Sequence, residues 1–315
     1  LLEKLISLTD RKVASDIYLE PFGGSGTTAA VAHKLGKKYV SIEISDYFDP
    51  VILKRLKYVY YGNSGGIEEN SSGLLKYIRL ESYEDALNNL CFNQNEQTQK
   101  SIESSPGLKE DYMLNYVLDA ETRGSQSLLN IDNFIDPTAY RLKVKKPGSD
   151  EYVMRNVDLL ETFNYLIGLR VVHIAAPDLI TGQFKRVKDS QLPEDQNTRL
   201  VIDGKIKQNK DNEAGNVWWF RKVEGWVPAD PMNPNNGMKE KVLIVWRKLT
   251  GDLEKDNLML DEWFTKNRIS ARDFEYDTIY VNGSNNLPNL RKDEETWKVR
   301  LIEEAFHQAM WDVEG

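Results

Sequence analysis

A glycine-rich string has the residue types and spacing best suited to ligand binding. It runs from Glu20 to Thr28, reads EPFGGSGTT, and lies between an apolar run and a segment with helical periodicity. Its glycines permit backbone angles that other residues avoid, and they let a ligand approach the main chain closely. The N–H groups at the start of the following helix favour polar or anionic ligand groups. The string therefore predicts a turn that holds a small ligand.

An acidic residue, Glu43, follows this turn at the end of the next apolar run. Nucleotide-binding α/β units have a carboxylate at about this place, where it binds the ribose hydroxyls of the ligand. The segment Gly24–Ala29 also fits the loose dinucleotide pattern, so an NAD-binding oxidoreductase is an alternative. A tight turn beside a surface glutamate, with no ligand, is the purely structural interpretation.

The elements that must position the turn alternate between strands and helices. Apolar runs predict strands at Asp16–Glu20 and Lys38–Glu43, and Thr27–Leu35 has apolar residues at helical spacing. Asp49 is expected to cap a helix over Val51–Val59. This order predicts the start of a doubly wound α/β fold, a partial Rossmann-like unit, with a right-handed crossover.

The remainder of the chain predicts a β-rich segment and a second βαβ unit. Further strands are expected at Lys76–Glu81, Tyr112–Leu118 and Tyr140–Lys145, and helices at Ser82–Asn89 and Asp158–Leu169. The βαβ unit is expected from Lys241–Trp246, Leu253–Thr265 and Thr278–Val281, closed by an amphipathic helix over Glu294–Trp311. The predicted domains are residues 1–170, a β-rich segment with a linker at 171–236, and a C-terminal α/β unit at 237–315.

Composition and charge exclude several classes of protein. The chain has 315 residues, of which 40% are hydrophobic and 29% charged, as in ordinary globular proteins. It has no apolar stretch of about 18 residues, so no membrane span is expected. The lone Cys91 fits a reducing cytoplasm, and with three scattered histidines it predicts no metal site. At a net charge of −8, any contact with DNA must come from a local basic patch.

The full nine-residue string resembles the Asp-Pro-Phe-x-Gly-Ser-Gly-Thr-Thr motif of S-adenosylmethionine-dependent DNA amino-methyltransferases, which modify adenine N6 or cytosine N4. Only Glu20 departs from that motif, with the same charge. The resemblance implies that Glu20 lies near the sulfonium and amino end of the cofactor and that Glu43 binds its ribose. The implied cofactor site, whose wall and floor include Phe22, Gly24 and Gly26, comprises Glu20, Phe22, Gly24, Ser25, Gly26, Thr27, Thr28 and Glu43.

Segments later in the sequence indicate a particular branch of this family. These segments resemble the C-terminal part of type III restriction-modification methylation subunits. They include Tyr77–Leu90, Ser127–Pro137, Lys241–Phe264 and Ile279–Leu290 of this chain. This resemblance implies methylation of adenine N6 in DNA and assembly with a restriction subunit and a second modification subunit. A non-catalytic assembly or DNA-contacting module of the same complex is a further alternative.

The catalytic motif of this family branch, Asp-Pro-Pro-Tyr, precedes the glycine motif. Its carboxylate and a backbone carbonyl accept the hydrogens of the adenine amino group, while its aromatic ring stacks on the flipped base. The nearest strings here, at Asp49, Asp136 and Asp230, lack the second proline and the adjacent aromatic residue. Because the chain starts within an expected helix, Leu1–Leu8, we expect a fragment of a longer protein that has no catalytic residues and does not methylate alone.

For several other residues a structural role is preferred over a role in binding or catalysis. Two basic clusters are able to neutralise phosphates, but solvated faces with scattered ion pairs are the simpler interpretation in an acidic chain. Adjacent Trp218 and Trp219 in a strand point to opposite faces, so one of them is expected in the core. His33 is expected to pack or face solvent. The basic clusters are Arg141, Lys143 and Lys145, and Lys185, Arg186 and Lys188.

Overall fold

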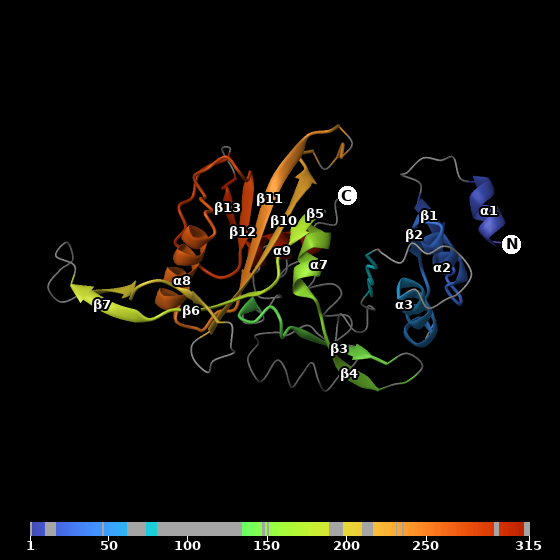
Figure 1. The fold of residues 1–315 in the computed structure, drawn as a ribbon, viewed down its shortest axis with the longest axis horizontal. Helices are drawn as coiled ribbons and strands as arrows, with labels where there is room; N and C mark the ends of the chain where they lie inside the picture. Colours follow the sequence, from blue (N-terminus) through green and yellow to red (C-terminus); the bar gives the residue numbers. More distant parts are fainter. Residues whose placement is uncertain are drawn as a thin grey trace, which may run out of the picture. The chain divides into compact units, whose positions relative to one another are not determined.

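A computed structural model describes most of the chain, which divides into two compact units (Figure 1). The N-terminal unit comprises Leu1–Asp85 with Val144–Val153, and the C-terminal unit comprises Ala86–Lys143 with Met154–Gly315. The described residues are 2–9, 17–45, 47–61, 74–80, 134–146, 149, 151–188, 198–209, 217–230, 232–234, 236–292 and 296–311. The expected elements at 82–89 and 112–118 and the lone Cys91 lie outside them.

The N-terminal unit has the predicted order of strands and helices around the glycine turn. β1 and β2 are parallel, and Tyr18 pairs with Tyr39. Their connection is α2, whose Ala29 packs with Ile52 and Leu56 in a small core. The elements are α1 (Leu2–Thr9), β1 (Ile17–Glu20), α2 (Thr27–Lys34), β2 (Lys38–Ser41), a π-helical segment (Phe48–Leu53) and α3 (Lys54–Tyr60). The predicted α/β class is confirmed.

One face of the β1–β2 pair is apolar and exposed to solvent. Because the strands pair in register, alternate residues share that face. The exposed fractions of their side chains are 61% for Ile17, 67% for Leu19 and 48% for Val40. Parallel sheets are ordinarily covered on both faces, so this face is unusual for a complete parallel fold.

Two local predictions in the N-terminal unit are wrong. Asp49 caps no helix, since the helical segment begins at Phe48 and Asp49 instead accepts a hydrogen bond of 3.0 Å from the Tyr77 hydroxyl. Residues 74–80 form no strand. The ring of Tyr77 stacks on Phe48 at 5.0 Å, whereas the side chains of Ile78 and Leu80 are exposed, so the segment is held by side-chain packing at Tyr77 and not by strand pairing.

The C-terminal unit is built on a seven-stranded mixed sheet with the strand order β13-β12-β11-β10-β6-β9, in which β5 also pairs with β10 (Figure 1). β11, β12 and β13 are parallel to one another, whereas β10 is antiparallel to β11, β5 and β6. The strands are β5 (Arg170–Ile174), β6 (Asp178–Thr181), β9 (Lys207–Gln208), β10 (Val217–Pro228), β11 (Lys239–Arg247), β12 (Thr278–Val281) and β13 (Val299–Leu301).

Two apolar cores form on opposite faces of this sheet. α8 (Leu253–Lys266) packs with Trp218 in one core, and α7 (Leu159–Leu166) and α9 (Ile302–Trp311) pack around Trp246 in the other. Trp219 packs against the second core, so the two adjacent tryptophans do point to opposite faces. Both rings are therefore structural. α9 buries its apolar side within its own chain, as expected.

The predicted βαβ unit is confirmed as β11–α8–β12, but the closing helix is shorter than expected. It begins at Ile302, and Val299–Leu301 instead form β13, parallel to β12. Pairing with Ile279 buries Val299, which helical periodicity does not reveal. The predicted boundary at 236/237 falls between β10 and β11, which are neighbours in one sheet.

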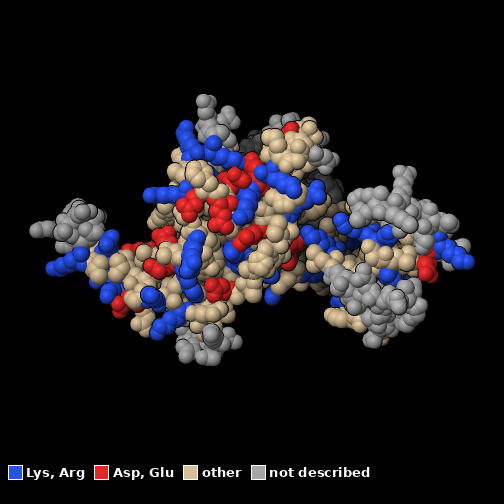
Figure 2. All heavy atoms as spheres, turned by 45° about the horizontal axis from the view of Figure 1, so that its top comes forward, with Lys and Arg blue, Asp and Glu red and all other residues tan. Residues whose placement is uncertain are grey.

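The structure also has two-stranded sheets outside the main sheet, and its surface carries both basic and acidic side chains. β3 (Arg141–Lys145) pairs with β4 (Tyr152–Asn156), and β7 (Phe184–Lys188) pairs with β8 (Thr198–Ile202). Basic and acidic side chains are interspersed on the face of the C-terminal unit in Figure 2. Lys185 pairs with Asp203 and Arg186 with Glu254, as the solvated-face interpretation predicts.

No helix among the described residues has the length and apolarity needed to cross a membrane.

Candidate cofactor-binding site

The glycine turn connects the carboxyl end of β1 to the amino end of α2 and is fastened to the segment after β2. Gly24 and Gly26 have φ angles of 54° and 73°, in the left-handed region that favours glycine. The N–H of Gly26 donates to the carbonyl of Gly23 at 2.7 Å, and the N–H of Gly23 donates to the carbonyl of Ile42 at 2.7 Å. The turn is therefore closed on itself and held to the segment that follows β2.

The three glycines differ in the space around them. A Cβ at Gly23 would lie 2.6 Å from Ser41 Oγ, and one at Gly26 would lie 3.0 Å from Ile52 Cγ2, so both positions are closely packed. At Gly24 the nearest atom is the Phe22 carbonyl oxygen at 3.9 Å. The main chain at Gly24 thus has an open side, where a ligand has room to approach.

Glu43 lies directly on this turn. Its Oε2 accepts a hydrogen bond of 2.6 Å from the N–H of Gly24. Its Oε1 accepts bonds from the N–H and the hydroxyl of Ser45, at 2.9 and 2.6 Å. The bond from the Ser45 hydroxyl, followed by the two backbone bonds, lowers the pKa of Glu43 below its ordinary value. The carboxylate is therefore ionised at neutral pH and held beside the open side of Gly24.

Glu20 has one bonded and one unbonded carboxylate oxygen. Its Oε1 accepts a hydrogen bond of 2.9 Å from the Thr28 hydroxyl, on the first turn of α2. Its Oε2 is buried and has no hydrogen-bond partner among the residues that the structure describes. Buried polar atoms in native proteins are nearly always bonded, so this oxygen has the properties of an acceptor for a ligand donor.

Arg55 completes the turn, although no local pattern had marked it. Its Nη1 donates to Ser25 Oγ at 3.1 Å and to Thr27 Oγ1 at 2.6 Å. These partners precede Arg55 by 30 and 28 residues, so only the folding of α3 against α2 brings them together. The guanidinium adds positive charge to the N–H end of α2, which already favours anionic groups. Ser45, which bonds to Glu43 only two residues away, was also missed, because no motif had marked it.

The structure thus brings seven of the expected site residues into one bonded turn, since Gly23–Thr28 link to Glu43, Glu20 and Arg55. The side chain of the eighth, Phe22, is 85% exposed and forms no part of the apolar core. No group of three metal-ligating side chains occurs among the described residues. The site is therefore a turn with a carboxylate on one side and a guanidinium on another.

His33 packs behind the turn as a structural residue. It is buried on α2, and its ring stacks on Tyr60 with a centroid distance of 3.9 Å. Its Nε2 has no hydrogen-bond partner in the described part of the chain. Burial lowers the pKa of His33 below its ordinary value of 6.5, so the imidazole is neutral in the folded unit.

Acidification is expected to destabilise the N-terminal unit through His33. Since its pKa is 6.5 when exposed and lower when folded, the unfolded chain binds the proton first. The free energy of unfolding should fall as the pH drops below that value, and the loss is complete once the pH is below the folded pKa. Urea unfolding followed by the NMR signals of Ala29 and Ala32 measures this. The His33→Gln variant should show a flatter pH profile; an identical profile in both proteins would contradict the assignment.

The N-terminal part of the chain has recognisable relatives. Residues 1–54 match a family model described as DNA methylase. This part of the chain is similar to DNA methylases. All eight expected site residues fall within the methylase segment, and Arg55 follows it directly. The predicted resemblance to DNA methyltransferases is confirmed for this segment.

Two curated proteins share the methylase likeness. A probable type III restriction-modification enzyme HindVI Mod subunit of Haemophilus influenzae is 45% identical over 69 residues, which are 22% of this chain and 9% of that protein. The type II methyltransferase M.BamHI of Bacillus amyloliquefaciens is 40% identical over 57 residues, which are 18% of this chain and 12% of that protein. The matches thus span about a tenth of these relatives. No solved structure matches the chain.

Proposed function

We propose that this chain carries the S-adenosylmethionine site and the C-terminal portion of a DNA adenine-N6 methyltransferase, the modification subunit of a type III restriction-modification system. The observation that carries the proposal is the Glu43 carboxylate bonded to the N–H of Gly24 within the methylase segment. A likeness to a Mod subunit supports the type III assignment. DNA, a restriction subunit and a second modification subunit are the proposed partners.

The residues around the turn fit the chemical groups of this cofactor. Glu43 would accept hydrogen bonds from the two ribose hydroxyls, which a carboxylate binds more strongly than a neutral acceptor does. The free Glu20 Oε2 would accept from the ammonium group. Arg55, with the N–H end of α2, would bind the carboxylate of the amino-acid part. When bound, the cofactor supplies the methyl group from its sulfonium.

The catalytic step is assigned to another part of the methyltransferase. The sequence contains no Asp-Pro-Pro-Tyr string to accept the hydrogens of the adenine amino group. The exposed apolar face of β1 and β2, including Ile17 and Leu19, supports this view, since further elements of a Rossmann-like domain would cover it. In this proposal the chain binds cofactor but does not methylate by itself.

Titration of the ¹⁵N-labelled chain with S-adenosylhomocysteine, and separately with NAD, tests the proposal. We expect the amide signals of Gly24, Gly26 and Glu43 to shift with S-adenosylhomocysteine and to stay unchanged with NAD. The absence of any shift with S-adenosylhomocysteine would refute the cofactor assignment. Stronger binding of NAD would favour an oxidoreductase instead.

A further inference from the structure

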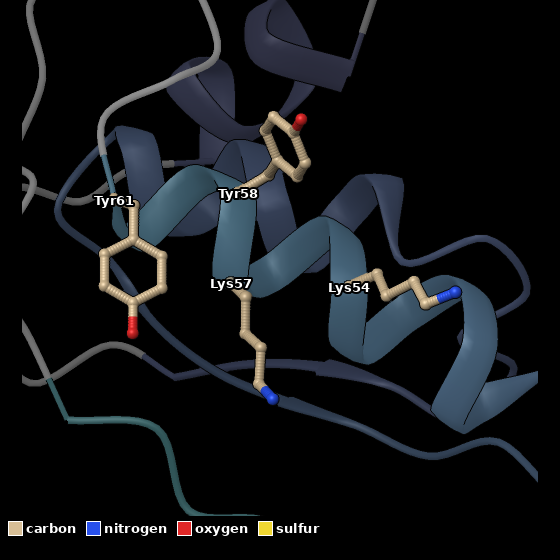
Figure 3. A pocket seen from close by; sticks show the side chains of 4 residues that line it. All are labelled: Lys54, Lys57, Tyr58 and Tyr61. Atoms are coloured by element: carbon tan, nitrogen blue, oxygen red, sulfur yellow. The ribbon is translucent and has the colours of Figure 1, made fainter.

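α3 has a basic and aromatic face whose side chains form no hydrogen bond or ion pair with the described residues of the glycine turn. Lys54, Lys57, Tyr58 and Tyr61 follow one another at the spacing of neighbours on a helix surface. They line a pocket of about 400 Å³ (Figure 3). We call these four residues the α3 face. The opposite side of the same helix buries Leu56 and Val59, which determines the direction in which the α3 face points.

The lysines of the α3 face have no acidic partner within the part of the chain that the structure describes. Neither Lys54 nor Lys57 forms an ion pair with a carboxylate of the described residues. This differs from the basic cluster on β7, where Lys185 and Arg186 each pair with an acidic residue. Two unpaired ammonium groups one helical turn apart make a local positive site on a chain whose net charge is −8. Such a site attracts a polyanion.

The exposed aromatic rings indicate which class of polyanion this face would bind. Tyr58 is 61% exposed and Tyr61 is 81% exposed, so neither ring contributes to the core. In Figure 3 the side chains of Lys57 and Tyr61 project from the same side of α3. A cation beside an exposed ring matches a nucleotide, whose phosphate takes the charge and whose base or sugar contacts the ring.

We infer that the α3 face binds DNA, with Lys54 and Lys57 on phosphates and Tyr58 and Tyr61 against bases or sugars. The choice of DNA rests on the proposed function, which this inference extends by naming the contact surface. Arg55 lies on the same helix and is bonded to Ser25 and Thr27, so α3 links the α3 face to the cofactor turn.

Fluorescence anisotropy with a short labelled DNA duplex, measured at several salt concentrations, tests the inference on the full chain. The double variant Lys54→Gln/Lys57→Gln should bind about tenfold or more weakly, and the slope of log Kd against log salt should fall by about 2, one for each lost phosphate contact. The matched control is Lys205→Gln/Lys266→Gln, two exposed lysines of the C-terminal unit, which should leave the slope unchanged.

Tyrosine variants test the aromatic part. Tyr58→Ala and Tyr61→Ala should each weaken binding of a labelled single strand by at least about fivefold, because stacking on bases is lost. Far-UV circular dichroism checks that each variant folds. Tyr58→Phe and Tyr61→Phe keep the rings and should retain most of the affinity.

Several results would overturn the inference. The first is a wild-type chain that binds neither the duplex nor the single strand at low salt. The second is a lysine variant whose slope of log Kd against log salt equals that of the wild type. The third is a control variant that loses as much affinity as the lysine variant. Weaker binding of poly-glutamate in the lysine variant, with DNA binding unchanged, would assign the α3 face to an acidic protein instead. S-adenosylhomocysteine titration of the same samples tests the proposed function separately, because a chain that binds DNA through the α3 face but no cofactor refutes only the cofactor assignment.

Discussion

Replacing Arg247 with methionine should lower the free energy of unfolding of the C-terminal unit by about 3–5 kcal/mol, the range for breaking one side of a buried charged network. Arg247 ends β11 and is 1% exposed. Its guanidinium donates to the backbone carbonyls of Asn282, Asp256 and Ser284 at 2.9, 3.0 and 2.8 Å. Methionine fills a similar volume but leaves these buried acceptors without donors.

The charge on Arg247 adds to this effect. Burial lowers the pKa of Arg247 to about 10, so the side chain is still a cation at neutral pH. Its positive charge faces the carboxylates of Asp256, Glu303 and Asp261. Removing it leaves the buried carboxylate of Asp256 without compensation in a poorly solvated place.

Urea unfolding followed by tryptophan fluorescence measures the loss. All seven tryptophans belong to the C-terminal unit, so the signal reports on that unit alone. The control is Arg272→Met at an exposed position, where a change within about 0.5 kcal/mol is expected. A loss in Arg247→Met no larger than in this control would contradict the role assigned to the network.

Replacing Glu43 with glutamine should weaken binding of S-adenosylhomocysteine by about 10- to 150-fold, the equivalent of one hydrogen bond to a charged group. The carboxylate accepts from the N–H of Gly24 and from Ser45 at once. A glutamine amide has a single acceptor oxygen, so its NH2 group must face one of these donors. Both the position and the charge of the proposed ribose acceptor are lost.

Isothermal titration calorimetry checks this result. The matched control is Glu3→Gln on the exposed side of α1, which should bind like wild type. The hydrogen bonds that lower the pKa of Glu43 also predict that binding persists on mild acidification, until the pH falls below the ordinary range of a glutamate. Unchanged affinity in Glu43→Gln would remove Glu43 from the site.

Much of the N-terminal unit followed from local patterns. β1, the glycine turn, α2 and β2 lie where alternation, glycine spacing and helical periodicity predicted them, because those signals depend on neighbouring residues. Segments whose structure depends on distant partners were mistaken. Residues 299–301 became a strand through pairing with β12, and 76–80 stayed irregular while Tyr77 packed on Phe48.

The residue types of the cofactor turn and the unusual backbone of Gly24 and Gly26 were readable from the chain, since a tight turn requires them locally. The contacts that give the turn its chemistry were not. Arg55 reaches Ser25 and Thr27 only because burial of Leu56 and Val59 determines the rotation of α3. The same burial turns Lys54 and Tyr58 to solvent. Helix orientation results from packing across the fold, so no string of adjacent residues encodes it.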